Sequence, residues 1–199
     1  MEFNYKANYL KAGLIVNQTQ TIAELLNNGQ SFSEIKLELE FKNILNTKSP
    51  VTAKTYFSII QSRLELLNSD FWNLIRYSDK ELSVQTIFVA SIKFSQLVGD
   101  FLRFTLRERL ELYYDDCPYS AWDAFIEQCY SRDANMSKFS SASYNKLRNQ
   151  TYNILIEAGF ISDIKKKLIC KPFFRPELLK LLNQHNEVYV LSCLDGMIW

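Results

Sequence analysis

The segment VQTIFVASIKFSQLVGDFL, residues 84–102, places the strongest constraint on the fold of this chain. Apolar side chains occur on every side of this segment when it is drawn as an α-helix, which predicts a helix buried at the centre of a bundle. Gln85, Lys93, Gln96 and Asp100 interrupt it. A charge in the middle of a bilayer is costly, so the segment fits a buried helix better than a membrane span. We therefore expect a cytoplasmic protein with no membrane contact.

Apolar residues spaced by three and four predict further helices along the chain. Ser31 and Glu34 have the spacing of a capping box, which predicts a helix that starts at residue 32. Pro50 suits the first turn of the next helix. Gly99 marks either a break or a close helix contact. The predicted helices cover residues 19–28, 32–46, 51–68, 69–77, 80–114, 120–131, 141–158 and 176–185.

Two later stretches predict strands. They are KKKLICKPFF at residues 165–174 and EVYVLSCL at residues 187–194. The second is rich in apolar and β-branched side chains, which indicates a buried strand. The helical pattern stops at the segment from Asp115 to Pro118. We therefore predict a mainly α fold, with a helical bundle over residues 1–117 and a winged-helix-like basic domain with a few short strands over residues 118–199.

The net charge of +1 hides a polarised chain. Residues 1–131 carry 13 Lys and Arg against 16 Asp and Glu, whereas residues 132–199 carry 10 against 6. All ten basic residues of the second part lie between Arg132 and Lys180. A basic region of this kind favours a polyanionic partner such as DNA.

The predicted helix 141–158, the basic turn after it and the predicted strand 165–174 have the order of a winged helix-turn-helix. Tyr144, Leu147, Thr151, Leu155 and Ala158 share one face of this helix, which we expect to pack inward. The opposite face carries asparagine and basic side chains, the types that bind base edges and phosphates. The predicted DNA-binding residues are Arg132, Lys138, Asn145, Lys146, Arg148, Asn149, Asn153, Lys165, Lys166, Lys167, Lys171 and Arg175.

Enzyme signatures are absent from the sequence. It has no Gly-rich phosphate loop, no G-x-S-x-G and no H-E-x-x-H motif, and its one histidine is His185. The cysteines Cys117, Cys129, Cys170 and Cys193 form no C-x-x-C pair, which argues against a zinc site. We predict no catalytic residues, no metal and no cofactor.

Several segments resemble one protein family. They are the helix end Asn43-Ile44-Leu45, the loop with Ser49-Pro50, the Thr-Ala-Lys helix that ends in Arg63-Leu64, and the later DFLRFTLRERL and YNILIEAGFIS. From about Tyr9 to Phe174 the chain resembles the BrxA family of BREX phage-defence systems. The resemblance implies a mainly helical protein with an N-terminal bundle similar to the antitermination factor NusB. It also implies DNA binding, beside larger BREX proteins that include a methyltransferase, an ATPase and a phosphatase-like protein.

Together these observations predict a non-enzymatic accessory protein of a bacterial BREX system that contacts double-stranded DNA through its basic C-terminal patch. The methyltransferase and the ATPase are the expected protein partners, within a larger assembly. Two alternatives stay open: a helical protein–protein adaptor, or an RNA-binding NusB-like factor without duplex DNA binding. A nuclease comes third, because no converging carboxylates are evident. Monomer and homo-oligomer are both compatible with the sequence.

Overall fold

The computed structural model describes residues 3–134, 136 and 138–198. The chain divides into two compact units, which are Leu14–Phe94 and the combination of Met1–Gly13 with Ser95–Trp199. The predicted domain boundary between residues 117 and 118 rests on the end of a sequence pattern rather than on contacts. The boundary between residues 117 and 118 therefore stays a prediction, separate from the division into these two units.

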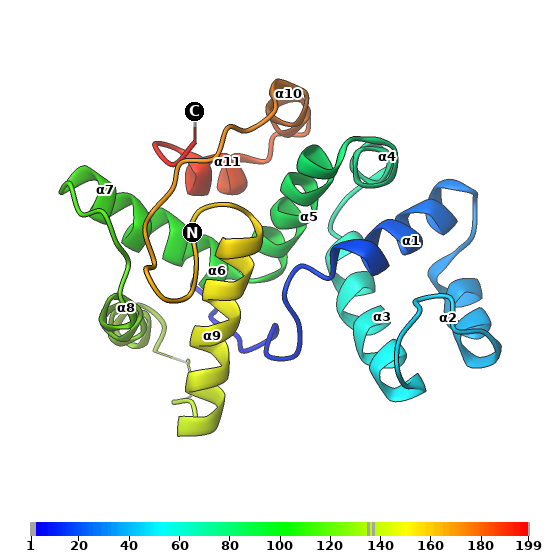
Figure 1. Ribbon diagram of the computed structural model, residues 1–199, viewed down its shortest axis with the longest axis horizontal. Helices are drawn as coiled ribbons and strands as arrows, with labels where there is room; N and C mark the ends of the chain where they lie inside the picture. Colours follow the sequence, from blue (N-terminus) through cyan, green and yellow to red (C-terminus); the bar gives the residue numbers. More distant parts are fainter. Residues whose placement is uncertain (1–2, 135, 137, 199) are drawn as a thin grey trace. The chain divides into compact units, whose positions relative to one another are not determined.

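The unit of residues 14–94 is a bundle of helices (Figure 1). Its helices are α1 (Val16–Asn27), α2 (Phe32–Phe41), α3 (Pro50–Leu64), α4 (Ser69–Tyr77) and α5 (Lys80–Phe94). Helix α1 packs against α4 and α5, and α3 packs against α2 and α5. Residues Ile87–Ala90 of α5 are all buried, as the apolar composition of this segment predicts.

The helix starts in this unit follow from local sequence. The Ser31 hydroxyl accepts a hydrogen bond from the Glu34 N–H at 3.3 Å, and the Glu34 carboxylate accepts one from the Ser31 N–H at 2.7 Å, so the predicted capping box is confirmed. The Ser49 hydroxyl accepts the Thr52 N–H at 3.2 Å in front of α3, with Pro50 in the first turn.

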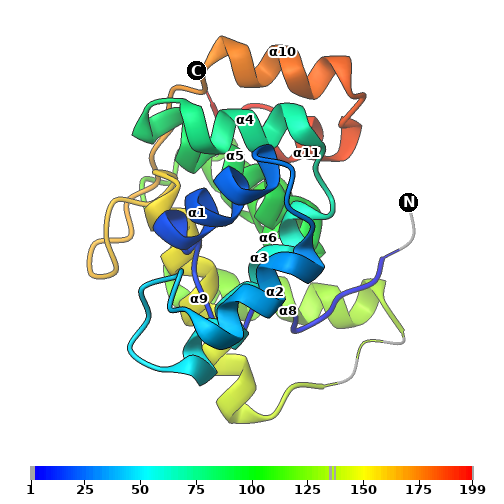
Figure 2. The ribbon, with the colours of Figure 1, turned by 90° about the vertical axis from the view of Figure 1, so that its right-hand side faces the viewer.

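The second unit contains the candidate DNA-binding residues. Its elements are α6 (Gln96–Asp100), the π-helix η1 (Phe101–Leu106), α7 (Arg107–Glu111), α8 (Tyr119–Arg132), α9 (Ser141–Glu157), α10 (Pro176–Gln184) and α11 (Val188–Leu194). Phe101 of η1 lies at the core, with ring centroids 5.3 Å from Trp122, 5.2 Å from Phe125 and 5.9 Å from Tyr152. Helices α10 and α11 pack against each other (Figures 1 and 2).

The N-terminal segment 3–13 belongs to this second unit. The Tyr5 hydroxyl donates to Asp100 Oδ2 at 2.9 Å, and the Tyr9 hydroxyl pairs with the Thr151 hydroxyl at 2.8 Å. Tyr189 of α11 donates to the other oxygen of Asp100 at 3.1 Å. Burial raises the pKa of Asp100, against the opposing effect of these two hydrogen bonds. One buried carboxylate therefore ties both ends of the chain to α6.

The predicted winged-helix part with short strands is wrong. Within residues 3–134, 136 and 138–198 the structure contains no strand, and only isolated antiparallel bridges join Asp116 to Leu168 and Ile161 to Ile169. The predicted strand 165–174 is interrupted because Asp163 folds the lysine run into a turn and Pro172 lacks a backbone N–H.

The second predicted strand, EVYVLSCL, is helix α11. Its buried residues Val190, Cys193 and Leu194 recur at spacings of three and one, which a helix places on one face. Packing against α10 therefore overrides the β-propensity of the valines.

The predicted helical region 80–114 is helical but not continuous. Ser95 has an extended backbone with φ −133° and ψ 107° and separates α5 from α6. Gly99, where we expected a break or a close contact, lies buried inside α6. The other predicted helices have counterparts in the structure, with ends shifted by up to five residues.

Candidate nucleic-acid interface

Helix α9 positions most of the predicted base-reading side chains. It begins after Ser140, whose hydroxyl accepts the Ser143 N–H at 3.3 Å, and it ends before Gly159, which has φ +81°. Leu147, Thr151 and Leu155 of the predicted inner face are fully buried. The outer face therefore presents exposed Asn145, Lys146, Asn149 and Asn153 to solvent.

Tyr119, the first residue of α8, gathers two of the predicted cations. The guanidinium carbon of Arg148 lies 4.2 Å from its ring centroid, and the Lys167 ammonium nitrogen lies 4.5 Å from the same centroid. Each such contact is worth about 0.5–1 kcal/mol at an exposed site. The ring thus holds a cation from α9 beside a cation from the turn that follows α9.

Contact with the buried Tyr152 fixes the position of the Tyr119 ring. Its ring meets the ring of Tyr152 edge-on, with centroids 4.9 Å apart and an interplanar angle of 88°. The buried Tyr152 hydroxyl lies 3.0 Å from the Cys117 carbonyl oxygen and 2.8 Å from that of Pro118. Burial raises the pKa of Tyr152 further above its ordinary value, which favours the protonated hydroxyl that these carbonyls require.

The predicted lysine run lies in a tight turn, which we call the basic turn and define as Asp163–Lys167. One carboxylate oxygen of Asp163 accepts the backbone N–H groups of Lys165 and Lys166, each at 2.7 Å. These two bonds hold the pKa of Asp163 below its usual value. Lys165 and Lys166 are exposed, and Figure 2 shows the loop after α9, in gold, projecting from its unit.

The basic turn is anchored on both sides. The Ser162 N–H donates to the Leu168 carbonyl at 2.9 Å, which closes the turn on itself. The Cys117 N–H donates to the Lys167 carbonyl at 2.9 Å, and the Ile169 N–H donates to the Asp115 carbonyl at 2.8 Å. The backbone ahead of α8 therefore holds the turn next to Tyr119.

Other predicted residues are placed differently. Arg132 lies with its guanidinium carbon 4.4 Å from the Phe104 ring centroid and donates to Gln128 at 2.9 Å, so it packs on its own unit. Arg175 pairs with Glu177 at 3.3 Å, and Lys171 is half-buried. Lys138 is exposed and lines a depression of about 310 Å³ together with Asn145 and aromatic side chains.

Sequence reasoning missed Tyr119 and Arg109. Arg109 donates from Nε to the Asp116 carbonyl and from Nη2 to its carboxylate, and so fixes the segment that anchors the basic turn. Tyr119 is 29 residues from Arg148 and 48 from Lys167 in the sequence, so no local pattern connects them. The only local signal is an aromatic residue directly after Pro118, at a helix start.

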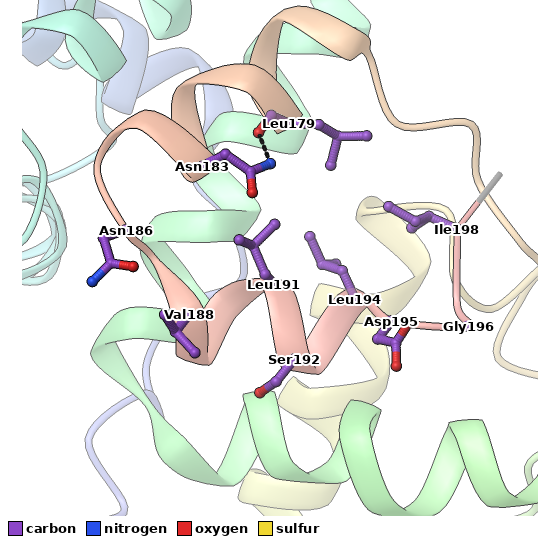
Figure 3. A pocket seen from close by; sticks show the side chains of 10 residues that line it. All are labelled: Leu179, Asn183, Asn186, Val188, Leu191, Ser192, Leu194, Asp195, Gly196 and Ile198. Atoms are coloured by element: carbon purple, nitrogen blue, oxygen red, sulfur yellow. Dashed lines mark hydrogen bonds between the residues drawn. The ribbon is translucent and has the colours of Figure 1, made fainter.

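A second concave feature lies along α10 and α11 (Figure 3). It has a volume of about 670 Å³ and is lined mainly by leucines and small polar residues, with the Asn183 amide donating to the Leu179 carbonyl at 2.7 Å. Its one acidic side chain, Asp195, lies 3.6 Å from Arg107. Among the residues that the structure describes, no group of three or more His, Cys, Asp or Glu side chains could hold a metal ion.

Helix lengths bear on membrane insertion. No single helix in the described part of the chain is both long and apolar enough to cross a bilayer. The helical segments on either side of Ser95 meet the length and composition requirement only when they are taken together.

The sequence also matches one family over most of its length. The BrxA family model covers residues 3–186. This chain belongs to the BrxA family. The resemblance expected from the sequence is thereby confirmed, and BrxA-family proteins of known name and structure can be compared with it.

Three BrxA-family relatives bear the name BREX protein BrxA. The one from Paramagnetospirillum magneticum (strain ATCC 700264 / AMB-1) is 33% identical over 99% of both chains. The one from Escherichia coli O9:H4 (strain HS) is 26% identical over 92% of this chain and 86% of the relative. The one from Bacillus cereus (strain H3081.97) is 22% identical over 96% of each.

The fold is also similar to that of a solved structure. This is a crystal structure of an uncharacterized protein from Magnetospirillum magneticum, with a TM-score of 0.88 and 30% sequence identity. The match covers 96% of this chain and 97% of that one. The fold described above is therefore similar to that of an experimentally determined structure.

Proposed function

We propose that this protein is a non-enzymatic DNA-binding accessory component of a bacterial BREX phage-defence system and acts in the cytoplasm. Membership in the BrxA family, with relatives named BREX protein BrxA, supports the assignment to BREX. Other BREX proteins, among them the methyltransferase and the ATPase, are the proposed protein partners.

The observation that carries the DNA-binding proposal is the pair of cations on one ring. Arg148 and Lys167 come from different elements and both lie within 4.5 Å of the Tyr119 centroid. Lys165 and Lys166 extend the positive charge along the basic turn. Cations held in fixed positions on one surface match the regular negative charge of a phosphate backbone.

The outer face of α9 adds groups suited to bases. Asn145, Asn149 and Asn153 lie four residues apart, which places successive side chains about 6 Å apart along one side of the helix. Asparagine amides donate to and accept from adenine edges in the major groove. The interface we propose therefore binds phosphates with its lysines and arginine and meets bases with α9.

A binding titration against salt tests the proposal. If Arg148, Lys165, Lys166 and Lys167 each contact a phosphate, the plot of log affinity against log salt has a slope of about −3.6. Affinity for a fluorescent duplex, measured by anisotropy, then falls roughly 150-fold between 50 and 200 mM salt. No binding to duplex DNA at low salt would refute the proposal.

A charge-reversal pair locates the interface. Lys165→Glu with Lys166→Glu should abolish duplex binding, since it replaces two attractive charges with repulsive ones. The matched control is Lys36→Glu with Lys48→Glu, which changes the net charge equally at two exposed positions of the other unit. Equal loss of binding in both variants would show that net charge, and not the basic turn, governs the interaction.

Surface side chains of the unit of residues 14–94 favour a second candidate function, a protein adaptor. Leu37 in the middle of α2 is 60% exposed, Phe41 at its end 85%, and Val51 at the start of α3 75%. Apolar side chains left in solvent suit contact with another protein. Phe41→Ser should then release co-purified BREX proteins while duplex binding stays unchanged, and competition with single-stranded RNA would expose a NusB-like preference for RNA.

A further inference from the structure

Helix α7 ends in a motif that normally uses glycine. The Tyr114 N–H donates to the Arg109 carbonyl at 2.8 Å, and the Tyr113 N–H donates to the Leu110 carbonyl at 3.1 Å. These are the two hydrogen bonds of a Schellman motif. In this motif the residue directly after the helix C-cap adopts the left-handed conformation. Here that residue is Tyr113, with φ +62°. A tyrosine costs conformational free energy at this position that a glycine would not.

Contacts within the chain do not compensate for this cost. Tyr113 is 93% exposed, so its ring rests on almost none of the protein. Its neighbour Tyr114 differs, because its ring centroid lies 4.4 Å from the guanidinium carbon of Arg109. A strained backbone that displays an aromatic ring to solvent points to a binding role for that ring.

Tyr113 lies directly before the segment 115–117, which is hydrogen-bonded to the end of the basic turn and the residues after it. It precedes Asp115 by two residues, a span of at most about 7 Å. Asp115 accepts the Ile169 N–H and Cys117 donates to Lys167, so the segment 115–117 is bonded to the far side of the turn. Arg109, one turn of helix before Tyr113, holds Asp116 in place.

A second residue with a left-handed backbone lies at the end of the basic turn itself. Lys167 has φ +53°, and its ammonium group lies against Tyr119. Among the described residues of this unit, Tyr113 and Lys167 are the left-handed residues that are neither glycine nor asparagine. Within this unit, these two residues with left-handed backbones therefore lie on neighbouring, hydrogen-bonded segments, one with an exposed aromatic ring and one with a cation.

We infer that Tyr113 stacks on an unpaired base of the DNA whose phosphates the basic turn contacts, so that the site takes duplex DNA with a single-stranded segment. This inference rests on the proposed function. A free aromatic ring stacks on any base whose face is open, and bases inside a duplex have both faces covered. The nearby lysines supply the attraction to the backbone on either side of that base.

The test compares Tyr113→Gly with Tyr113→Phe and with Tyr77→Ala, which removes another well-exposed tyrosine, in the other unit. The probes are a blunt duplex and the same duplex with a single-stranded overhang that carries the fluorescent base 2-aminopurine. Wild-type protein should prefer the overhang and quench its fluorescence. Tyr113→Gly should lose the quenching and about tenfold in affinity for the overhang. Tyr113→Phe and Tyr77→Ala should behave as wild type.

Thermal unfolding supplies the second readout. Tyr113→Gly should raise the melting temperature, because it relieves the strained conformation and removes no packing. A lower melting temperature would overturn the premise that the residue is strained. Unchanged quenching and unchanged overhang affinity in Tyr113→Gly would overturn the inference. If blunt duplex binding still depends on Lys165 and Lys166 in that case, the proposed function stands. If wild type binds neither probe at low salt, both fail.

Discussion

Replacing Tyr119 with leucine tests whether DNA affinity depends on the fixed positions of two cations, because the substitution leaves the number of cations unchanged. The substitution keeps an apolar side chain over Tyr152 but removes the ring that Arg148 and Lys167 contact at 4.2 and 4.5 Å. Both cations remain in the protein. They lose their fixed positions, and DNA must then immobilise them when it binds.

The expected magnitude follows from the number of side chains released. Immobilising a long flexible side chain at an interface costs about 0.5–1.5 kcal/mol, so two of them cost about 2 kcal/mol. That free energy corresponds to a roughly 30-fold weaker affinity for duplex DNA. The salt dependence should not change, because the same number of phosphates is still contacted. Removing a cation outright, as in Arg148→Gln, should instead reduce the slope by about 0.9.

Fluorescence anisotropy at several salt concentrations measures both quantities. Tyr119→Phe is the matched control, since it keeps the ring face and the edge contact with Tyr152, and it should bind within about twofold of wild type. Circular dichroism confirms that each variant is folded. The reasoning is refuted if Tyr119→Leu binds as tightly as wild type, or if Tyr119→Phe is weakened equally.

Three further predictions concern the unit that carries the interface. Phe101→Ala should lower the free energy of unfolding by about 3–5 kcal/mol, measured by urea denaturation, because a fully buried ring at the core is lost; a cost below about 1 kcal/mol would contradict this packing. Burial raises the pKa of Asp100, so its contribution to stability is present at low pH and is lost as pH rises through the raised pKa. Asp100→Asn should therefore gain stability relative to wild type as pH rises above the ordinary aspartate pKa and through the raised one, and a constant difference would argue against the raised pKa. Asp163→Ala should speed amide hydrogen exchange at Lys165 and Lys166, whose N–H groups it leaves without their carboxylate acceptor, and unchanged rates would show that the turn needs no such bond.

Helix starts were predictable because their causes are local. The capping box of Ser31 and Glu34 and the position of Pro50 act within one turn of helix, and the structure confirms both. The inward face of α9 was predictable for the same reason, since its periodicity alone places Leu147, Thr151 and Leu155 together. The match to the BrxA family likewise confirmed a resemblance carried by short segments.

Features that depend on distant contacts were not predictable. The valines of EVYVLSCL favour a strand locally, and only packing beside α10 makes that segment helical. Arg132 was assigned to the basic patch from charge alone, whereas its surroundings include Phe104 and Gln128. The arrangement around Tyr119 joins residues from α8, α9 and the basic turn, and no spacing in the sequence encodes it.

The hydrogen bonds of the N-terminal segment constrain the order in which the chain matures on the ribosome. Tyr5 bonds to a residue 95 positions later and Tyr9 to one 142 positions later. Residues 14–94 form a contiguous unit that is complete early in synthesis, whereas the Tyr5 and Tyr9 hydroxyls can form these hydrogen bonds only after α6 and α9 have emerged. The entropic cost of loop closure grows slowly with loop length. The delay before these two hydrogen bonds form is therefore set by the time that translation takes and not by the entropy of closure. Slower elongation after residue 94 should therefore lengthen the time for which the N-terminal tyrosines are open to proteases.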